Sequence, residues 1–151
     1  MLEKAMFDTV AIVGVGMIGG SVAAALRERG LAGRIHGFDA DRAHLDAALA
    51  TGLIDAAPSG SVAGDLILIA VPVLSVGSVL ADLAPAFAEG AIVTDVLSVK
   101  RPVLDAARAS LGTMPESLVP GHPIAGSERR GPAAADPQLF VDHRVILTPT
   151  A

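Results

Sequence analysis

The sequence of 151 residues contains no cysteine, which excludes disulfide bonds, thiolate catalysis and cysteine metal sites. Charged residues are also scarce, at 18% of the total, and the formal net charge is -5. Sequence-independent binding of nucleic acid needs a basic face that displaces counterions, so this acidic balance argues against a nucleic-acid partner. Since cysteine is absent, we expect the cytoplasm as the compartment.

Long hydrophobic runs are missing as well. The one stretch without charge that approaches the length of a membrane span lies between Asp65 and Asp82, and Pro72 and Gly77 interrupt it. The few residues before the first expected strand leave no room for the apolar core of a signal peptide. We therefore expect neither a membrane span nor a targeting segment.

Apolar residues are plentiful, at 52%, and they occur in segments that alternate between strand-like and helix-like patterns. Such alternation predicts an α/β domain with a doubly wound, mostly parallel sheet and helices on both faces. We expect strands at residues 9–13, 34–38, 66–71, 91–95, 117–119 and 145–148, and helices at residues 21–29, 42–50, 75–88 and 100–111. Asp41 and Ser75 are expected helix caps, and Gly52 a helix terminator. No internal boundary is visible, so residues 1–151 form one domain.

A glycine pattern follows the first expected strand and opens a helix. Gly14 allows a tight turn, Gly16 lets the backbone approach a diphosphate, and Gly19 lets the helix pack closely on the strand. The amides of Met17 and Ile18 would point toward the phosphates, together with the positive end of the helix. This context predicts a Rossmann-type dinucleotide site.

An acidic residue, Asp39, lies at the end of the second expected strand, twenty positions after Gly19. A carboxylate there can accept hydrogen bonds from the adenosine ribose hydroxyls and repels a 2′-phosphate, which favours NAD over NADP. Arg42 leaves the alternative open, since it is able to stack on adenine or to help accept a 2′-phosphate.

Ligands bind beyond the carboxyl ends of the strands in an open α/β sheet. Val71 and Pro72, at the third strand end, are expected to flank the adenine-ribose side of the cofactor. The next strand end carries Asp95, Ser98 and Lys100, and we expect this hydroxyl and these two charges at the nicotinamide mouth.

His122 stands between a glycine and a proline in an expected loop. Imidazole is the natural general base near neutral pH, so His122 is the candidate proton acceptor; the alternative is a histidine that only satisfies loop carbonyls. The other histidines are weaker candidates, because His36 lies in a strand, His44 is expected on a helix surface and His143 in a polar loop.

The chain resembles the N-terminal nucleotide-binding domain of the prephenate/arogenate (cyclohexadienyl) dehydrogenase family. Four stretches carry the resemblance, at residues 13–21, 37–39, 94–100 and 121–128, and the His-Pro-Ile-Ala-Gly-Ser-Glu run is the most selective. The resemblance implies NAD-dependent oxidative decarboxylation of prephenate to 4-hydroxyphenylpyruvate, or of arogenate to tyrosine, in tyrosine biosynthesis. It does not settle which of the two is the substrate.

The resemblance also implies roles for single residues. His122 matches the catalytic histidine that hydrogen-bonds the ring hydroxyl of the substrate, and Ser98 a serine that bridges this histidine, the nicotinamide and the substrate. Ser127 matches a small hydroxyl residue near the substrate, and Glu128 an acidic partner in the polar network. No metal is implied. The family's helical second domain supplies a carboxylate-binding arginine and the homodimer contact; we expect it to lie outside this chain, which is then a fragment.

Two other functions stay open. One is a dehydrogenase of the β-hydroxyacid type, which relies on a lysine of a later helix. The other is an NAD-binding domain without catalysis, which the pair of Ser98 and His122 argues against.

Overall fold

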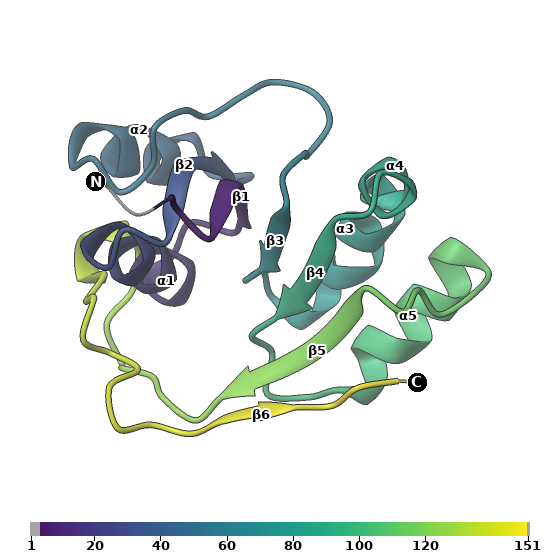
Figure 1. Ribbon diagram of the computed structural model, residues 1–151. Helices are drawn as coiled ribbons and strands as arrows, with labels where there is room; N and C mark the ends of the chain where they lie inside the picture. The colour runs from purple at the N-terminus through teal and green to yellow at the C-terminus, as the bar shows by residue number, and fades with distance from the viewer. Residues whose placement is uncertain (1–3, 151) are drawn as a thin grey trace.

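The computed structural model describes residues 4–150, in which six strands form one sheet of order β2-β1-β3-β4-β5-β6 (Figure 1). The first five strands are parallel, and β6 runs antiparallel to β5. The strands are β1 (Phe7–Val13), β2 (Ala32–Phe38), β3 (Leu66–Ile69), β4 (Ile92–Asp95), β5 (Leu118–Pro123) and β6 (Val145–Leu147).

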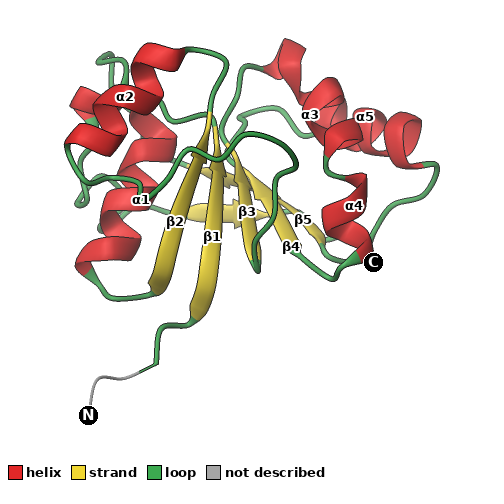
Figure 2. Cartoon of the chain, turned by 90° about the horizontal axis from the view of Figure 1, so that it is seen from above, coloured by secondary structure: helices red, strands yellow, loops and turns green. Residues whose placement is uncertain are grey.

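Helices cover the sheet on both sides. Figure 2 shows α1 and α2 on one side of the sheet and α3, α4 and α5 on the other. Two short 3₁₀ turns accompany them, so that the helical segments are α1 (Met17–Glu28), α2 (Arg42–Ala50), η1 (Val73–Ser75), α3 (Val76–Asp82), α4 (Ala84–Ala88), α5 (Arg101–Leu111) and η2 (Pro132–Ala134). The predicted doubly wound, mostly parallel fold is confirmed.

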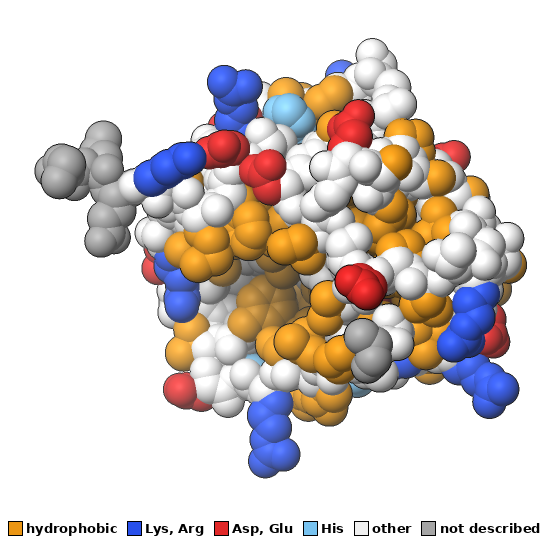
Figure 3. Space-filling model, turned by 45° about the vertical axis from the view of Figure 1, so that its right-hand side comes forward, with side chains coloured by type: hydrophobic (Ala, Val, Ile, Leu, Met, Phe, Trp, Pro, Cys, Tyr) orange, Lys and Arg blue, Asp and Glu red, His pale blue; other side chains and the backbone are white. Residues whose placement is uncertain are grey.

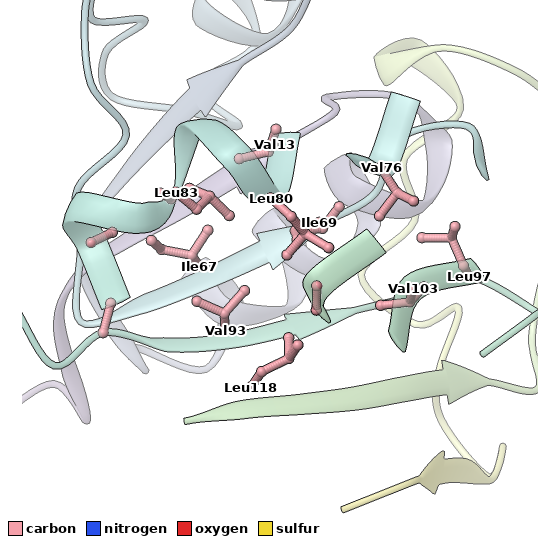
Figure 4. Packing of buried hydrophobic residues seen from close by; sticks show 14 residues of the cluster. Val13, Ile67, Ile69, Val76, Leu80, Leu83, Val93, Leu97, Val103 and Leu118 are labelled. Atoms are coloured by element: carbon pink, nitrogen blue, oxygen red, sulfur yellow. The ribbon is translucent and has the colours of Figure 1, made fainter. Parts of the chain in front are cut away.

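The central strands are apolar on both faces because helices lie against both. Successive side chains of a strand point to opposite faces, so alternate residues of β1 and β3 enter two separate cores. Ile67 and Ile69 pack with Leu80, Leu83 and other residues of α3–α5 (Figure 4). The other core lies under α1 and α2 and includes Val10, Ile12, Ala23, Ile35, Leu45 and Leu68.

Two local predictions near the third helix were wrong. The helix expected over residues 75–88 is divided at Leu83 into α3 and α4. Pro85 at the start of α4 has no N–H to continue the hydrogen bonding of α3, which explains the break. Ser75 forms no side-chain cap. The other expected cap is confirmed, since the Asp41 carboxylate accepts the N–H of Ala43 at 2.9 Å.

Residues 124–144, which we call the return segment, leave β5, reach α1 and come back as β6 (Figure 1). The segment is fixed to α1 by two hydrogen bonds. The N–H of Asp136 donates to the buried Ser21 Oγ at 2.9 Å, and Gln138 Nε2 donates to Glu28 Oε1 at 2.9 Å. The start of α1 is therefore enclosed by residues far away in the sequence.

Candidate functional site

The turn between β1 and α1 requires glycine at two positions. Gly14 has φ +99°, and a Cβ on it would lie 2.3 Å from the Ala70 carbonyl oxygen. A Cβ on Gly19 would lie 2.0 Å from the Gly14 carbonyl oxygen. Both contacts are to backbone, which cannot move aside cheaply, so the turn brings β1, β3 and α1 closer together than any larger residue allows.

The third glycine of the turn differs, because a Cβ on Gly16 would meet nothing within 4 Å. Gly16 precedes α1 and offers no side chain to cap the first turn of the helix, where Met17 and Ile18 lie. Helix N–H groups at this position have no partner within the helix and bind anions. The open space over Gly16 and the uncapped helix therefore fit a diphosphate.

The Asp39 carboxylate lies directly behind this turn. It accepts the N–H of Val15 at 2.8 Å and the N–H of Asp41 at 2.8 Å, so the end of β2 is tied to the glycine turn. His44 Nδ1 lies 3.3 Å from Asp39 Oδ2. His44 lies on the surface of α2, as expected, with its side chain 36% exposed, but the sequence analysis did not predict its contact with Asp39. Arg42 points elsewhere and pairs with Asp46 at 2.9 Å on the exposed side of α2.

The contact of His44 was detectable in principle from the sequence. His44 lies three residues after the Asp41 cap, in the first turn of α2, which places it above the end of β2. The signal that could have predicted the contact is the Asp41 cap, because it holds the first turn of α2 over the end of the preceding strand.

The end of β3 lies against the glycine turn. The Ala70 N–H donates to the Val13 carbonyl at 2.7 Å, and Val71 and Pro72 follow at once. Val71 is half-buried and Pro72 is exposed. Both therefore stand at the same sheet edge as Gly14 and Gly16, as expected for residues that flank a bound nucleotide.

Ser98 and His122 stand at the ends of the neighbouring strands β4 and β5. The last pair of these strands is Asp95 with Pro120, so Ser98 lies three residues and His122 two residues beyond it. Ser98 is exposed and His122 half-buried. In the described part of the chain, neither side chain forms a hydrogen bond to another protein group.

The prediction that His122 lies in a loop was wrong. His122 belongs to β5 and pairs with Ile146 of β6. The strand continues past the end of β4 because β6 supplies a partner on its other side. The ladder thus fixes the backbone of His122, which a loop would leave free.

The expected position of Asp95 and Lys100 at the mouth of the site was also wrong. The Asp95 side chain is 0% exposed and that of Lys100 18% exposed, and the two form an ion pair. The Asp95 carboxylate also accepts the N–H groups of Leu97 at 3.0 Å and Gly121 at 3.3 Å. Since these partners satisfy the charge, the carboxylate is stable in the interior and does not face the open edge.

Ser127 and Glu128 are exposed residues of the return segment. Ser127 Oγ accepts the N–H of Arg129 at 3.1 Å, which forms a turn. Within residues 4–150 neither residue forms a hydrogen bond or an ion pair with His122, and residues 124–126 separate them from β5.

Hydrophobic side chains gather around a hollow on one face of the molecule (Figure 3). A cavity of about 310 Å³ lies between α1, the ends of β3–β5 and β6, and its lining includes Val22, Thr94, Val96, Gly121, Phe140 and Leu147. No pattern in the sequence indicated that Phe140 of the return segment would reach the sheet. Over residues 4–150, no group of three or more His, Asp or Glu side chains is placed to hold a metal ion, and no helix is long and apolar enough to cross a membrane.

Comparisons with known proteins agree with this geometry. Residues 22–151 match the family model described as "Prephenate dehydrogenase, nucleotide-binding domain". The chain belongs to this family.

The curated relatives include the cyclohexadienyl dehydrogenase of Zymomonas mobilis, 37% identical over 97% of this chain and 50% of that protein. The prephenate dehydrogenase of Bacillus subtilis is 38% identical over 95% of this chain and 40% of its own length. Among solved structures, prephenate dehydrogenase from A. aeolicus, in complex with hydroxyphenyl propionate and NAD+, aligns with TM-score 0.84 and 35% identity over 95% of this chain and 51% of that chain. The chain thus spans about half the length of these relatives.

Proposed function

We propose that this chain is the NAD-binding half of a dehydrogenase that oxidatively decarboxylates prephenate, arogenate or both in tyrosine biosynthesis. One observation carries the proposal: in a chain of this family, Gly16, Ser98 and His122 all stand at the carboxyl edge of one parallel sheet. This edge is where open α/β sheets bind nucleotides and substrates.

The glycine turn supports NAD as the cofactor. The open space over Gly16 and the amides of Met17 and Ile18 fit the diphosphate, while Gly14 and Gly19 allow the close packing of the turn. Asp39, tied to Val15, keeps a negative charge where the adenosine ribose binds, which disfavours a 2′-phosphate. In this proposal Val71 and Pro72 flank the nucleotide, and Ser98 reaches the nicotinamide.

The reaction removes a hydride from the ring carbon that bears the hydroxyl, and NAD+ supplies the hydride acceptor when bound. His122 accepts the hydroxyl proton as the carbonyl forms. The ring carboxylate leaves as carbon dioxide, and the electrons of its bond complete the aromatic ring. Ser98 hydrogen-bonds the reacting oxygen, and Ser127 and Glu128 complete the polar surroundings of the substrate.

The relatives differ in their named substrates, since the A. aeolicus and B. subtilis proteins are prephenate dehydrogenases and a Synechocystis structure, 31% identical with TM-score 0.80, is an arogenate dehydrogenase. Both substrates therefore belong in the test. We further propose that a second, helical half completes the substrate pocket and forms a homodimer.

The test joins this chain to the second half of the Zymomonas mobilis cyclohexadienyl dehydrogenase and follows NADH formation with prephenate and with arogenate. We expect turnover by the joined protein and none by the chain alone. His122→Asn should lower the maximal rate by about 10²–10⁴-fold, the usual contribution of a general base. The acidic limb of the pH profile should disappear with it.

His143→Asn is the matched control, because His143 is exposed and its ring lies against the nearby Val141 carbonyl at 2.8 Å. That variant should keep the full rate. A joined protein that binds NAD but turns over neither substrate would instead support a binding domain without catalysis.

A further inference from the structure

Both backbone polar groups of Gly121, the residue that precedes His122, are held by charged side chains. Pairing between β4 and β5 ends at Asp95 and Pro120, so Gly121 lies one residue beyond the last pair and faces no strand on that side. Its N–H donates to Asp95 Oδ1 at 3.3 Å, and its carbonyl accepts a hydrogen bond from Lys100 Nζ. A carboxylate and an ammonium group thus replace the missing strand partner.

The same carboxylate reaches the segment that carries Ser98. Asp95 Oδ2 accepts the N–H of Leu97 at 3.0 Å and pairs with Lys100. Ser98 and His122 each follow directly after a residue that Asp95 holds. One buried side chain therefore fixes the backbone on both sides of the candidate site.

Gly121 explains why such a restraint is needed. A Cβ at this position would lie 2.9 Å from the Asp95 carbonyl oxygen and 3.2 Å from Thr94 Oγ1, so the close approach of the strands requires glycine. Glycine has the widest choice of backbone angles, and a rotation of its peptide would carry the His122 ring with it. Pairing with Leu147 of β6 restrains Gly121 on one side, and the two charged contacts restrain it on the side where β4 has ended.

We propose that Asp95 and Lys100 are positioning residues that set the His122 ring relative to Ser98. This inference rests on the proposed function, in which the side chains of His122 and Ser98 act on the substrate. A buried ion pair is often no more stabilising than apolar residues of the same size, so fold stability alone does not explain the pair. Its hydrogen bonds to Gly121 and Leu97 give it a task that apolar residues lack.

The experiment compares Lys100→Met, Asp95→Leu, which removes the acceptor oxygens as well as the charge, and the double variant that carries both changes. Each single variant leaves one buried charge without its partner, and we expect a lower melting temperature for both. The double variant removes both charges, so it should recover most of the decrease in melting temperature that each single variant shows. In the double variant the Gly121 carbonyl nevertheless still lacks the hydrogen bond from Lys100. Arg101→Met is the matched control, since it removes an exposed charge from the adjacent residue.

Two readouts then separate positioning from stability. In this chain alone, the amide hydrogens of Gly121 and Leu97 should exchange faster in the double variant than in the unchanged chain. In the joined two-half enzyme, the double variant should lose about 10- to 100-fold in kcat, since a small displacement of a catalytic group costs that order. NAD affinity should stay the same, because the diphosphate rests on a different strand end.

The inference would be overturned if the amide hydrogen of Gly121 exchanged at the same rate in the double variant as in the unchanged chain. It would also be overturned if the double variant recovered its kcat together with its melting temperature. If the joined enzyme with the unchanged chain is itself inactive, the proposed function fails. The exchange measurement on the chain alone then still decides whether Asp95 and Lys100 hold the peptide.

Discussion

Cofactor choice is the property that this chain should show without any second half. We predict that it binds NAD more tightly than NADP, because the Asp39 carboxylate is fixed at the ribose end of the site by the N–H groups of Val15 and Asp41. Its side chain is 13% exposed, so water screens the charge only in part. The perturbation that tests this is Asp39→Asn, which removes the charge and keeps the shape.

The expected size of the effect follows from Coulomb's law. Two unit charges about 5 Å apart interact by roughly 3 kcal/mol at an effective dielectric constant of about 20, and by roughly 1 kcal/mol in bulk water. The preference for NAD over NADP should therefore shrink by about 5- to 150-fold, at roughly 1.4 kcal/mol for each factor of ten. Asp39→Ser should narrow the preference too, with a larger loss of stability, because a serine is too short to keep the contact with Val15.

Calorimetric titration of the chain with each cofactor measures both affinities directly. Raising the salt concentration should weaken the discrimination, since it screens the same charges. Equal or tighter binding of NADP by the unchanged chain would refute the reasoning and point to Arg42 as a 2′-phosphate ligand. Arg42→Gln is therefore the companion variant, and it should leave NAD affinity unchanged, because the Arg42 guanidinium pairs with Asp46.

Three further predictions concern stability and association. Partial burial raises the pKa of Asp55, but hydrogen bonds from the Ile35 backbone and from Arg27 outweigh this effect, so the net pKa lies below 3.8. Asp55→Asn should therefore lower the stability to urea at neutral pH. The difference in stability from the unchanged chain should vanish as the pH falls below 3.8 and through the lowered pKa. Gly19→Ala should lower the melting temperature and weaken NAD binding, with a cost of about 1–3 kcal/mol or more in urea unfolding, because its Cβ meets the Gly14 carbonyl; an unchanged melting temperature would contradict the close packing of α1. The half-exposed apolar side chains of β6, together with residues 139 and 140, should cause weak self-association of the chain, and Ile146→Asn should reduce it. Sedimentation of the unchanged chain as a clean monomer at high concentration would count against a contact surface there.

The fold was predictable from local pattern because its central strands are apolar on both faces. Ile67, Leu68 and Ile69 form a run that only a sheet buried on both sides accommodates, and the turn after β1 needs its glycines wherever it occurs. Such features depend on neighbouring residues in the sequence. The alternation of strands and helices then indicated a parallel sheet with helices on both faces.

The errors at His122 and Asp95 have a different cause, which is contact between residues that are distant in the sequence. His122 lies in a strand only because β6, more than twenty residues later, pairs with it. The Asp95 carboxylate is satisfied in the interior partly by the N–H of Gly121, which is 26 residues later in the sequence. A sequence pattern shows that a residue is charged or titratable, but its partners decide whether it faces solvent, substrate or another strand.

The attachment of the return segment to α1 bears on the order in which the domain is completed. Ser21 and Asp136 are 115 residues apart in the sequence, so the helix at the glycine turn emerges from the ribosome long before the residue that satisfies its buried hydroxyl. Closing so long a loop is slow and entropically costly. A shortened chain that stops after β5 would contain every residue of the glycine turn and still leave Gly20 and Ser21 uncovered, since Pro132 and Ala135 lie against that face. The smallest unit that binds a dinucleotide well is therefore longer than the mononucleotide half that contains the glycines, and nascent chains should acquire cofactor affinity only after the return segment has folded onto α1.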